Sequence, residues 1–92
     1  MIVDFRCKDT EQLWRTKQNR RFANIARVAL RKLIMLDAAD SVADLRVPPA
    51  NRLESLKGDR KGQYSIRIND QFRVCFRFFG GNAERIEIVD YH

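Results

Sequence analysis

The chain has 92 residues, of which 45% are hydrophobic and 33% are charged. This length allows one modest core, so we expect residues 1–92 to form a single domain. Its apolar runs fall short of the roughly 20 residues that a membrane-spanning helix needs, so we expect no membrane partner. The opening MIVDFRCKD lacks the basic-then-apolar order of a secretion signal, which favours a cytoplasmic protein.

The charge balance is the informative part of the composition. Lysine and arginine number 18 against 12 acidic residues, for a net charge of +6. Most of the basic residues are arginines, which bind phosphates through two parallel hydrogen bonds. A polyanionic partner such as nucleic acid fits this balance, although small basic domains also arise for solubility. The two cysteines, Cys7 and Cys75, are too few for a disulfide framework or a metal site.

The first elements are a short strand and a helix. Residues 2–7, IVDFRC, alternate apolar and polar and predict a strand. Asp9 precedes Gln12 at the spacing of a capping box, so we expect a helix to begin near Thr10. The inward side chains would be Val3, Phe5, Cys7, Leu13 and Trp14.

Residues 19–41 predict a second, longer helix. Apolar side chains recur three and four positions apart, as on one buried face: Phe22, Ile25, Ala26, Ala29, Leu33 and Leu36. Residues 12–36 contain no acid and seven basic residues: Arg15, Lys17, Arg20, Arg21, Arg27, Arg31 and Lys32. This basic surface is either a nucleic-acid contact, with ribosomal RNA as a candidate, or simply a solvated helix side, which is the safer default.

A loop-rich connector follows, because Pro48 and Pro49 end any helix. We expect Leu53 and Leu56 to anchor it in the core, and its end reads LKGDRKG. The glycines allow tight turns or a close approach to a ligand, but they do not have the spacing of a nucleotide-binding loop.

The last third predicts three antiparallel strands joined by tight turns at Asn69–Gln71 and Gly80–Asn82. One face of this meander is apolar: Tyr64, Ile66, Ile68, Phe72, Val74, Phe76, Phe78, Ile86 and Ile88. The whole chain therefore predicts an α+β fold, in which an N-terminal strand and two helices precede a three-stranded meander. The helices would cover one face of a small twisted sheet.

The opposite face of the meander carries Arg67, Arg73 and Arg77, with no acid on those two strands. Arg67 and Arg73 flank the same turn, so their side chains could converge on an anion. If the last strand pairs beside them, Tyr91 and the single histidine, His92, reach the rim of this face. A terminal histidine is more often inert, but one held here could exchange protons near neutral pH.

These residue types suit phosphodiester cleavage in RNA without a metal or cofactor. The 2′-hydroxyl attacks the adjacent phosphorus, which requires a proton acceptor, a proton donor and positive charge on the phosphorane. With one histidine, a second proton-transfer role falls to Asp90, Tyr91 or Lys57. No nucleophile signature for acyl transfer and no metal-ligand cluster is present.

Two segments carry a resemblance to a known family. LKGDRKGQYSIRINDQFRVCF and the final EIVDYH resemble the HigB toxins of the RelE/ParE-like superfamily of toxin–antitoxin modules. The resemblance implies a basic sheet face that cleaves mRNA in the ribosomal A site. It also implies neutralisation by a HigA-like antitoxin, through which alone the toxin would reach operator DNA.

Residue roles follow from the same resemblance. Lys57 and Arg73 would hold the phosphate, with Arg67 nearby. His92 would lead proton transfer, supported by Asp90 and Tyr91. The alternatives are a non-enzymatic ribosome or gyrase inhibitor of the same fold, or a basic co-repressor that acts only with its antitoxin.

Overall fold

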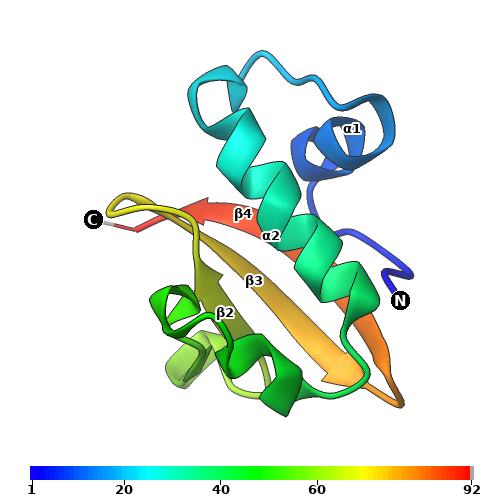
Figure 1. Ribbon diagram of the computed structural model, residues 1–92, viewed down its shortest axis with the longest axis vertical. Helices are drawn as coiled ribbons and strands as arrows, with labels where there is room; N and C mark the ends of the chain where they lie inside the picture. The colour runs from blue at the N-terminus through cyan, green and yellow to red at the C-terminus, as the bar shows by residue number, and fades with distance from the viewer. Residues whose placement is uncertain (92) are drawn as a thin grey trace.

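The computed structural model describes residues 1–91, and within them it contains two α-helices and one four-stranded antiparallel sheet. The helices are α1 (Lys8–Thr16) and α2 (Ala26–Ala38). The strands, in their order across the sheet, are β1 (Glu54–Ser55), β2 (Tyr64–Arg67), β3 (Phe72–Phe79) and β4 (Asn82–Asp90). The α+β class is confirmed (Figure 1), and β1 is a strand that the sequence did not predict.

The apolar face of the sheet packs against both helices. β3 pairs with β2 and with β4, so Val74 lies between Ile66 and Ile88. Of the predicted core residues of the helices, Trp14 and Ala26 are only partly buried, and the rest are buried against this face: Leu13, Phe22, Ile25, Ala29, Leu33 and Leu36. The period-2 pattern of the strands and the 3.6-residue pattern of the helices therefore identify one shared core.

The N-terminal segment does not form the predicted strand. It makes two isolated parallel bridges to the edge of β4, at Ile2 and Phe5, and these two side chains pack against the core while Val3 is 48% exposed. The cause is a β-bulge in β4, where Arg85 takes a positive φ of 50°. Asp4 turns toward this bulge, and its carboxylate accepts the Arg85 N–H at 2.9 Å, so the alternation breaks.

The first helix begins at Lys8, not near Thr10, and the expected capping box is absent. Asp9 lies inside the helix, where its carboxylate accepts a hydrogen bond from Asn19 at 3.1 Å and pairs with Arg21 at 3.4 Å. A capping-box spacing was therefore a misleading signal, because the acid serves a tertiary contact.

The second helix is shorter than predicted. The Asn19 side chain accepts the Phe22 backbone N–H at 3.2 Å, and a 3-10 turn at Ala23–Ile25 precedes the first α-helical residue. After the helix, the Asp44 carboxylate accepts the backbone N–H groups of Asp40 and Ser41. Side chains that hydrogen-bond the backbone locally compete with helix continuation at both ends.

The two ends of the sheet are closed differently. Gly80 and Gly81 both have positive φ, as the two-residue turn between β3 and β4 requires, and the Met1 amino group donates to the Gly81 carbonyl at 3.0 Å. Figure 1 shows the N-terminus at this end of the sheet and the end of β4 near the β2–β3 turn. None of the helices in residues 1–91 is long and apolar enough to cross a membrane.

Candidate active site on the open face of the sheet

The face of the sheet opposite the helices carries the candidate site at the β2–β3 turn. Arg67 and Arg73 are direct cross-strand partners, as their positions around the turn predicted. Together with Tyr91 they line a cavity of about 330 Å³. Its other lining residues are Arg52, Glu54, Asn69 and Asp70. This volume is at the small end of the range for ligand cavities.

Arg73 is the most firmly held cation of the cavity, with a residual exposure of 8%. Its Nε donates to the Ser65 hydroxyl at 2.8 Å, and its Nη2 donates to the Arg52 carbonyl at 2.6 Å. The Glu54 carboxylate lies 3.8 Å from the same Nη2. Among residues 1–91, Nη1 has no hydrogen-bond partner, so two N–H groups of the fork remain for a ligand.

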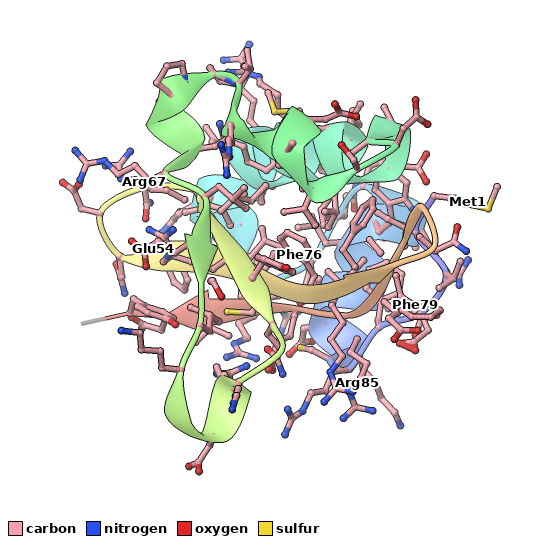
Figure 2. The ribbon with its side chains drawn as sticks, turned by 90° about the horizontal axis from the view of Figure 1, so that it is seen from below. Met1, Glu54, Arg67, Phe76, Phe79 and Arg85 are labelled. Atoms are coloured by element: carbon pink, nitrogen blue, oxygen red, sulfur yellow. The ribbon has the colours of Figure 1, made fainter. Side chains whose placement is uncertain are left out.

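Arg67 is more open than Arg73 and is hydrogen-bonded to the exposed carboxylate of Asp70. Figure 2 shows Arg67 and Glu54 at the same end of the sheet, with Phe79 and Met1 at the other. The cavity thus holds three arginines and two carboxylates, and an incoming phosphate would compete with Asp70 for Arg67. Strands β2 and β3 carry no acid, as the sequence shows, and the two carboxylates of the cavity come from β1 and from the β2–β3 turn.

Tyr91 forms the wall of the cavity at the end of β4. Its ring centroid lies 6.0 Å from the Arg73 guanidinium carbon, and its backbone N–H donates to the Gln71 carbonyl. Cys75, on β3, is fully buried on the same face of the sheet, and its thiol influences the pKa of the Tyr91 hydroxyl. Burial raises the pKa of the Tyr91 hydroxyl and of the Cys75 thiol, so both groups are protonated at neutral pH.

Arg60 covers the middle of the same face. Its Nη1 donates to the Glu87 carboxylate at 2.7 Å, and this hydrogen bond raises the pKa of Arg60. Glu87 also lies 3.9 Å from Arg6. Arg77, farther along β3, is exposed and pairs in register with Glu84, so it lies outside the cavity.

The other predicted site residues lie in different places. Lys57 is exposed before the 3-10 turn Gly58–Arg60 and does not line the cavity. Asp90 is exposed at the end of β4, where Gln71 donates to it at 3.1 Å, and strand alternation points it away from Tyr91. His92 lies outside the described residues, so its role stays a prediction.

Arg52 and Glu54 are cavity residues that the sequence reasoning missed. Both lie in the connector, whose irregular pattern gave no face to assign. The signal that could have indicated them is their place in the sequence, just before the LKGDRKG motif that begins at Leu56.

Lys32 corrects the interpretation of the basic helix. It is only 8% exposed, and its ammonium donates to the Asn51 side-chain oxygen at 2.7 Å. One of the seven basic residues is thus buried. Burial and the nearby charges of Arg31 and Arg67 lower the pKa of Lys32.

The chemistry available to the cavity is anion binding with charge stabilisation. A partly buried guanidinium acts on a bound anion more strongly than a solvated one, because water screens it less. Among residues 1–91, no group of three or more His, Cys, Asp or Glu side chains could hold a metal ion.

Comparison with known proteins identifies the class. The fold is similar to that of the toxin in two structures of YoeB–YefM toxin–antitoxin complexes from Staphylococcus aureus. For one of them the TM-score is 0.64, at 21% identity, over 100% of this chain and 95% of that chain. A YafQ variant from Escherichia coli is similar with a TM-score of 0.55 at 16% identity, over 94% of this chain and 89% of that chain. The architecture is therefore that of the YoeB and YafQ toxins.

The sequence narrows this class. Residues 3–92 match the family model described as the RelE-like toxin of the type II toxin–antitoxin system HigB. The chain therefore belongs to the HigB family of type II toxins. Toxin HigB-1 of Vibrio cholerae serotype O1 is 41% identical over 85 residues, which cover 90% of each chain. Endoribonuclease HigB of Proteus vulgaris is 34% identical over 61 residues, 66% of this chain and 65% of that relative.

Proposed function

We propose that this HigB-family toxin is a metal-independent endoribonuclease that cleaves mRNA in the A site of the ribosome. The observation that carries the proposal is the cavity in which Arg67, Arg73 and Tyr91 meet. The relative from Proteus vulgaris bears the name of an endoribonuclease, which supports ribonuclease activity in this chain.

The proposed reaction is an internal transesterification of the RNA. The 2′-oxygen attacks the adjacent phosphorus while its proton passes to a base of the protein. The bond from phosphorus to the 5′-oxygen breaks, and that oxygen takes a proton from an acid. The products are a 2′,3′-cyclic phosphate and a free 5′-hydroxyl, so neither water nor an oxidant is consumed.

Arg73 stabilises the phosphorane in this mechanism. It is held by Ser65 and by the Arg52 carbonyl, so its free N–H groups are oriented before the substrate arrives. Arg67 binds the same phosphate after exchanging Asp70 for it. Lys57 lies outside the cavity lining and would contact a neighbouring phosphate along the strand.

Proton transfer has two candidate acceptors, His92 and Glu54. His92 directly follows Tyr91 in the chain, and Glu54 lines the cavity as a half-exposed carboxylate beside Arg73. The Tyr91 hydroxyl is protonated at neutral pH and would serve as a donor or stack on a base, although burial raises its pKa and so weakens it as an acid. Asp90 would support the site from the strand end.

The partners follow from this function. A HigA-like antitoxin would neutralise the toxin, in keeping with the toxin–antitoxin complexes among the structural neighbours. Contacts with 16S rRNA and mRNA phosphates would make ribosome binding salt-dependent. Operator DNA would be reached only through the antitoxin.

The test is to incubate the purified protein with mRNA, with and without programmed ribosomes, and to map the new 5′ ends. Wild type, His92→Gln and Glu54→Gln are compared, with Glu84→Gln as an acidic control on the same face. We expect ribosome-dependent cuts bearing a 5′-hydroxyl, retained in the control and strongly reduced in the variant that lacks the proton acceptor.

Absence of cuts from a folded, growth-inhibiting wild-type protein would contradict the nuclease function. A gyrase supercoiling assay on the same protein then addresses the alternative target. Cuts that persist in both acceptor variants would leave the nuclease standing and remove His92 and Glu54 from the proton-transfer step.

A further inference from the structure

Two hydrogen bonds, one on each side of the Asn51–Arg52 peptide, connect the buried Lys32 to Arg73. Arg73 depends on the Arg52 carbonyl, which accepts its Nη2 at 2.6 Å. Arg52 itself adopts a left-handed backbone, with φ of 45° and ψ of 56°. A non-glycine residue takes this conformation at an energetic cost, so its surroundings must hold it there.

Asn51, the preceding residue, stabilises the left-handed backbone of Arg52. It is fully buried, and its side-chain N–H group donates to the carbonyls of Leu45 at 3.1 Å and Val47 at 3.4 Å. These bonds fold the connector around one amide. The amide oxygen is left to accept from Lys32, at 2.7 Å, which fixes the connector to α2.

A lysine at position 32 lowers the stability of the folded protein. Among residues 1–91 no carboxylate lies within ion-pair distance of it, and Arg31 and Arg67 add positive charge nearby. Burying an ammonium without a counter-ion costs stability, whereas an apolar side chain on the packed side of α2 would not incur this cost. A purely structural helix-to-connector contact therefore does not require a lysine here.

We infer that Lys32 is a positioning residue of the phosphate site, acting through Asn51 and the Arg52 carbonyl to orient the Arg73 guanidinium. Lys32 does not touch the substrate in this arrangement, since it does not line the cavity. The inference rests on the proposed cleavage reaction for its kinetic effect, but the orientation of Arg73 is a property of the free protein.

The experiment is a double-substitution cycle measured on cleavage of ribosome-bound mRNA. Lys32→Met removes the ammonium group, which is both the hydrogen-bond donor to Asn51 and the charge. Arg73→Lys removes the planar guanidinium that donates to the Arg52 carbonyl. We expect Lys32→Met alone to lower kcat by about 10- to 100-fold with little change in KM, because a shift of about 1 Å in a catalytic group costs this much. In the Arg73→Lys background the same substitution should have little effect.

Lys8→Met is the matched control, because it makes the same chemical change at an exposed position of α1. If Lys32→Met does not fold, Lys32→Gln, which keeps an N–H donor without the charge, takes its place in the cycle. An equal loss of kcat in both Arg73 backgrounds would overturn the inference, since Lys32 would then act independently of Arg73.

A second readout does not depend on activity. The Nε–H proton of Arg73, bonded to Ser65 and nearly buried, should exchange slowly with solvent in an NMR spectrum of the wild type. Lys32→Met should shift this signal and speed its exchange, while Lys8→Met leaves it unchanged. If the wild type cleaves nothing, the proposed function fails, and this signal still decides whether Lys32 positions Arg73. An unshifted, slowly exchanging signal in Lys32→Met would overturn the inference.

Discussion

The two faces of the sheet have different roles, although the same strands, with alternating side chains, supply both. The face under the helices is filled by apolar side chains from both helices and from β2, β3 and β4, such as Leu33, Phe76 and Ile88. The open face holds Arg73 by hydrogen bonds to the Ser65 hydroxyl and to the Arg52 carbonyl of the connector, beside the buried Cys75. Stability is concentrated on the first face and chemistry on the second, so substitutions should separate the two properties.

The largest effect is expected on the helix face. Phe76 is fully buried and packs with its ring centroid 6.1 Å from that of Tyr64. Phe76→Ala should lower the free energy of unfolding by about 3–5 kcal/mol, because it removes apolar contacts and leaves a cavity. Urea denaturation followed by circular dichroism measures this.

Phe79→Ala is the matched control, since Phe79 lies on the same strand but is 80% exposed. Its unfolding free energy should stay within about 0.5 kcal/mol of the wild type. A comparable loss in both variants would mean that the two faces do not differ in their share of the core.

The next effect is on catalysis and comes from the open face. Arg73→Ala should lower the rate of mRNA cleavage on ribosomes by about 100- to 1,000-fold, the usual cost of removing a donor that stabilises transition-state charge. Arg77→Ala, on the same strand but outside the cavity, should cleave at close to the wild-type rate. Equal losses would indicate that general positive charge, and not the cavity, supports the reaction.

A smaller effect is expected where the two properties overlap. Ser65→Ala leaves the buried Arg73 Nε–H without its hydroxyl partner at 2.8 Å. An unsatisfied buried donor of this kind should lower the unfolding free energy by about 1–3 kcal/mol. Because the hydroxyl also orients the guanidinium, kcat should fall in the same variant. Ser65→Thr, which keeps a hydroxyl, should recover part of both losses in denaturation and cleavage assays.

The smallest effect is on the pH dependence of stability. The folded state lowers the pKa of Lys32 below 10.5, so between the folded pKa and 10.5 the unfolded chain binds more protons. The contribution of Lys32 to the unfolding free energy must therefore rise with pH in this window. Cys75 and Tyr91, whose pKa values are raised, act in the opposite direction in any variant that retains them.

The difference in unfolding free energy between wild type and Lys32→Met isolates the contribution of Lys32. The stability of the wild type relative to the variant should increase as the pH rises toward 10.5, as measured by urea denaturation at successive pH values. A difference that stays flat with pH would mean that Lys32 is charged to the same extent in both states.

The sequence predicted the helix face well and the open face in part. Buried positions such as Leu33 and Val74 follow from the periodicity of their own elements, which is a local property. The pairing of Arg67 with Arg73 also follows, because a tight turn fixes the register. Arg52, Glu54 and Lys32 could not be placed in this way, since their positions depend on how an irregular connector packs on distant elements.

The N-terminal strand was mispredicted for a related physical reason. Alternation in residues 2–7 is a strand signal only where the partner strand is regular, and β4 has a bulge at Arg85 that Asp4 satisfies. The bulge and its acceptor are separated by 81 residues. No local pattern can report such a contact.

The bridges between the first residues and β4 also bear on how the protein is made. Ile2 pairs with Ala83, and Phe5 with Ile86, so the N-terminal segment lies along the edge of the last strand. Contacts of such long sequence separation form slowly and only when both segments are present. Because synthesis proceeds from the N-terminus, β4 and Tyr91 are the last of the described residues to leave the ribosome. A nascent chain therefore lacks the Tyr91 wall of the cavity until the segment that contains β4 and Tyr91 has been made.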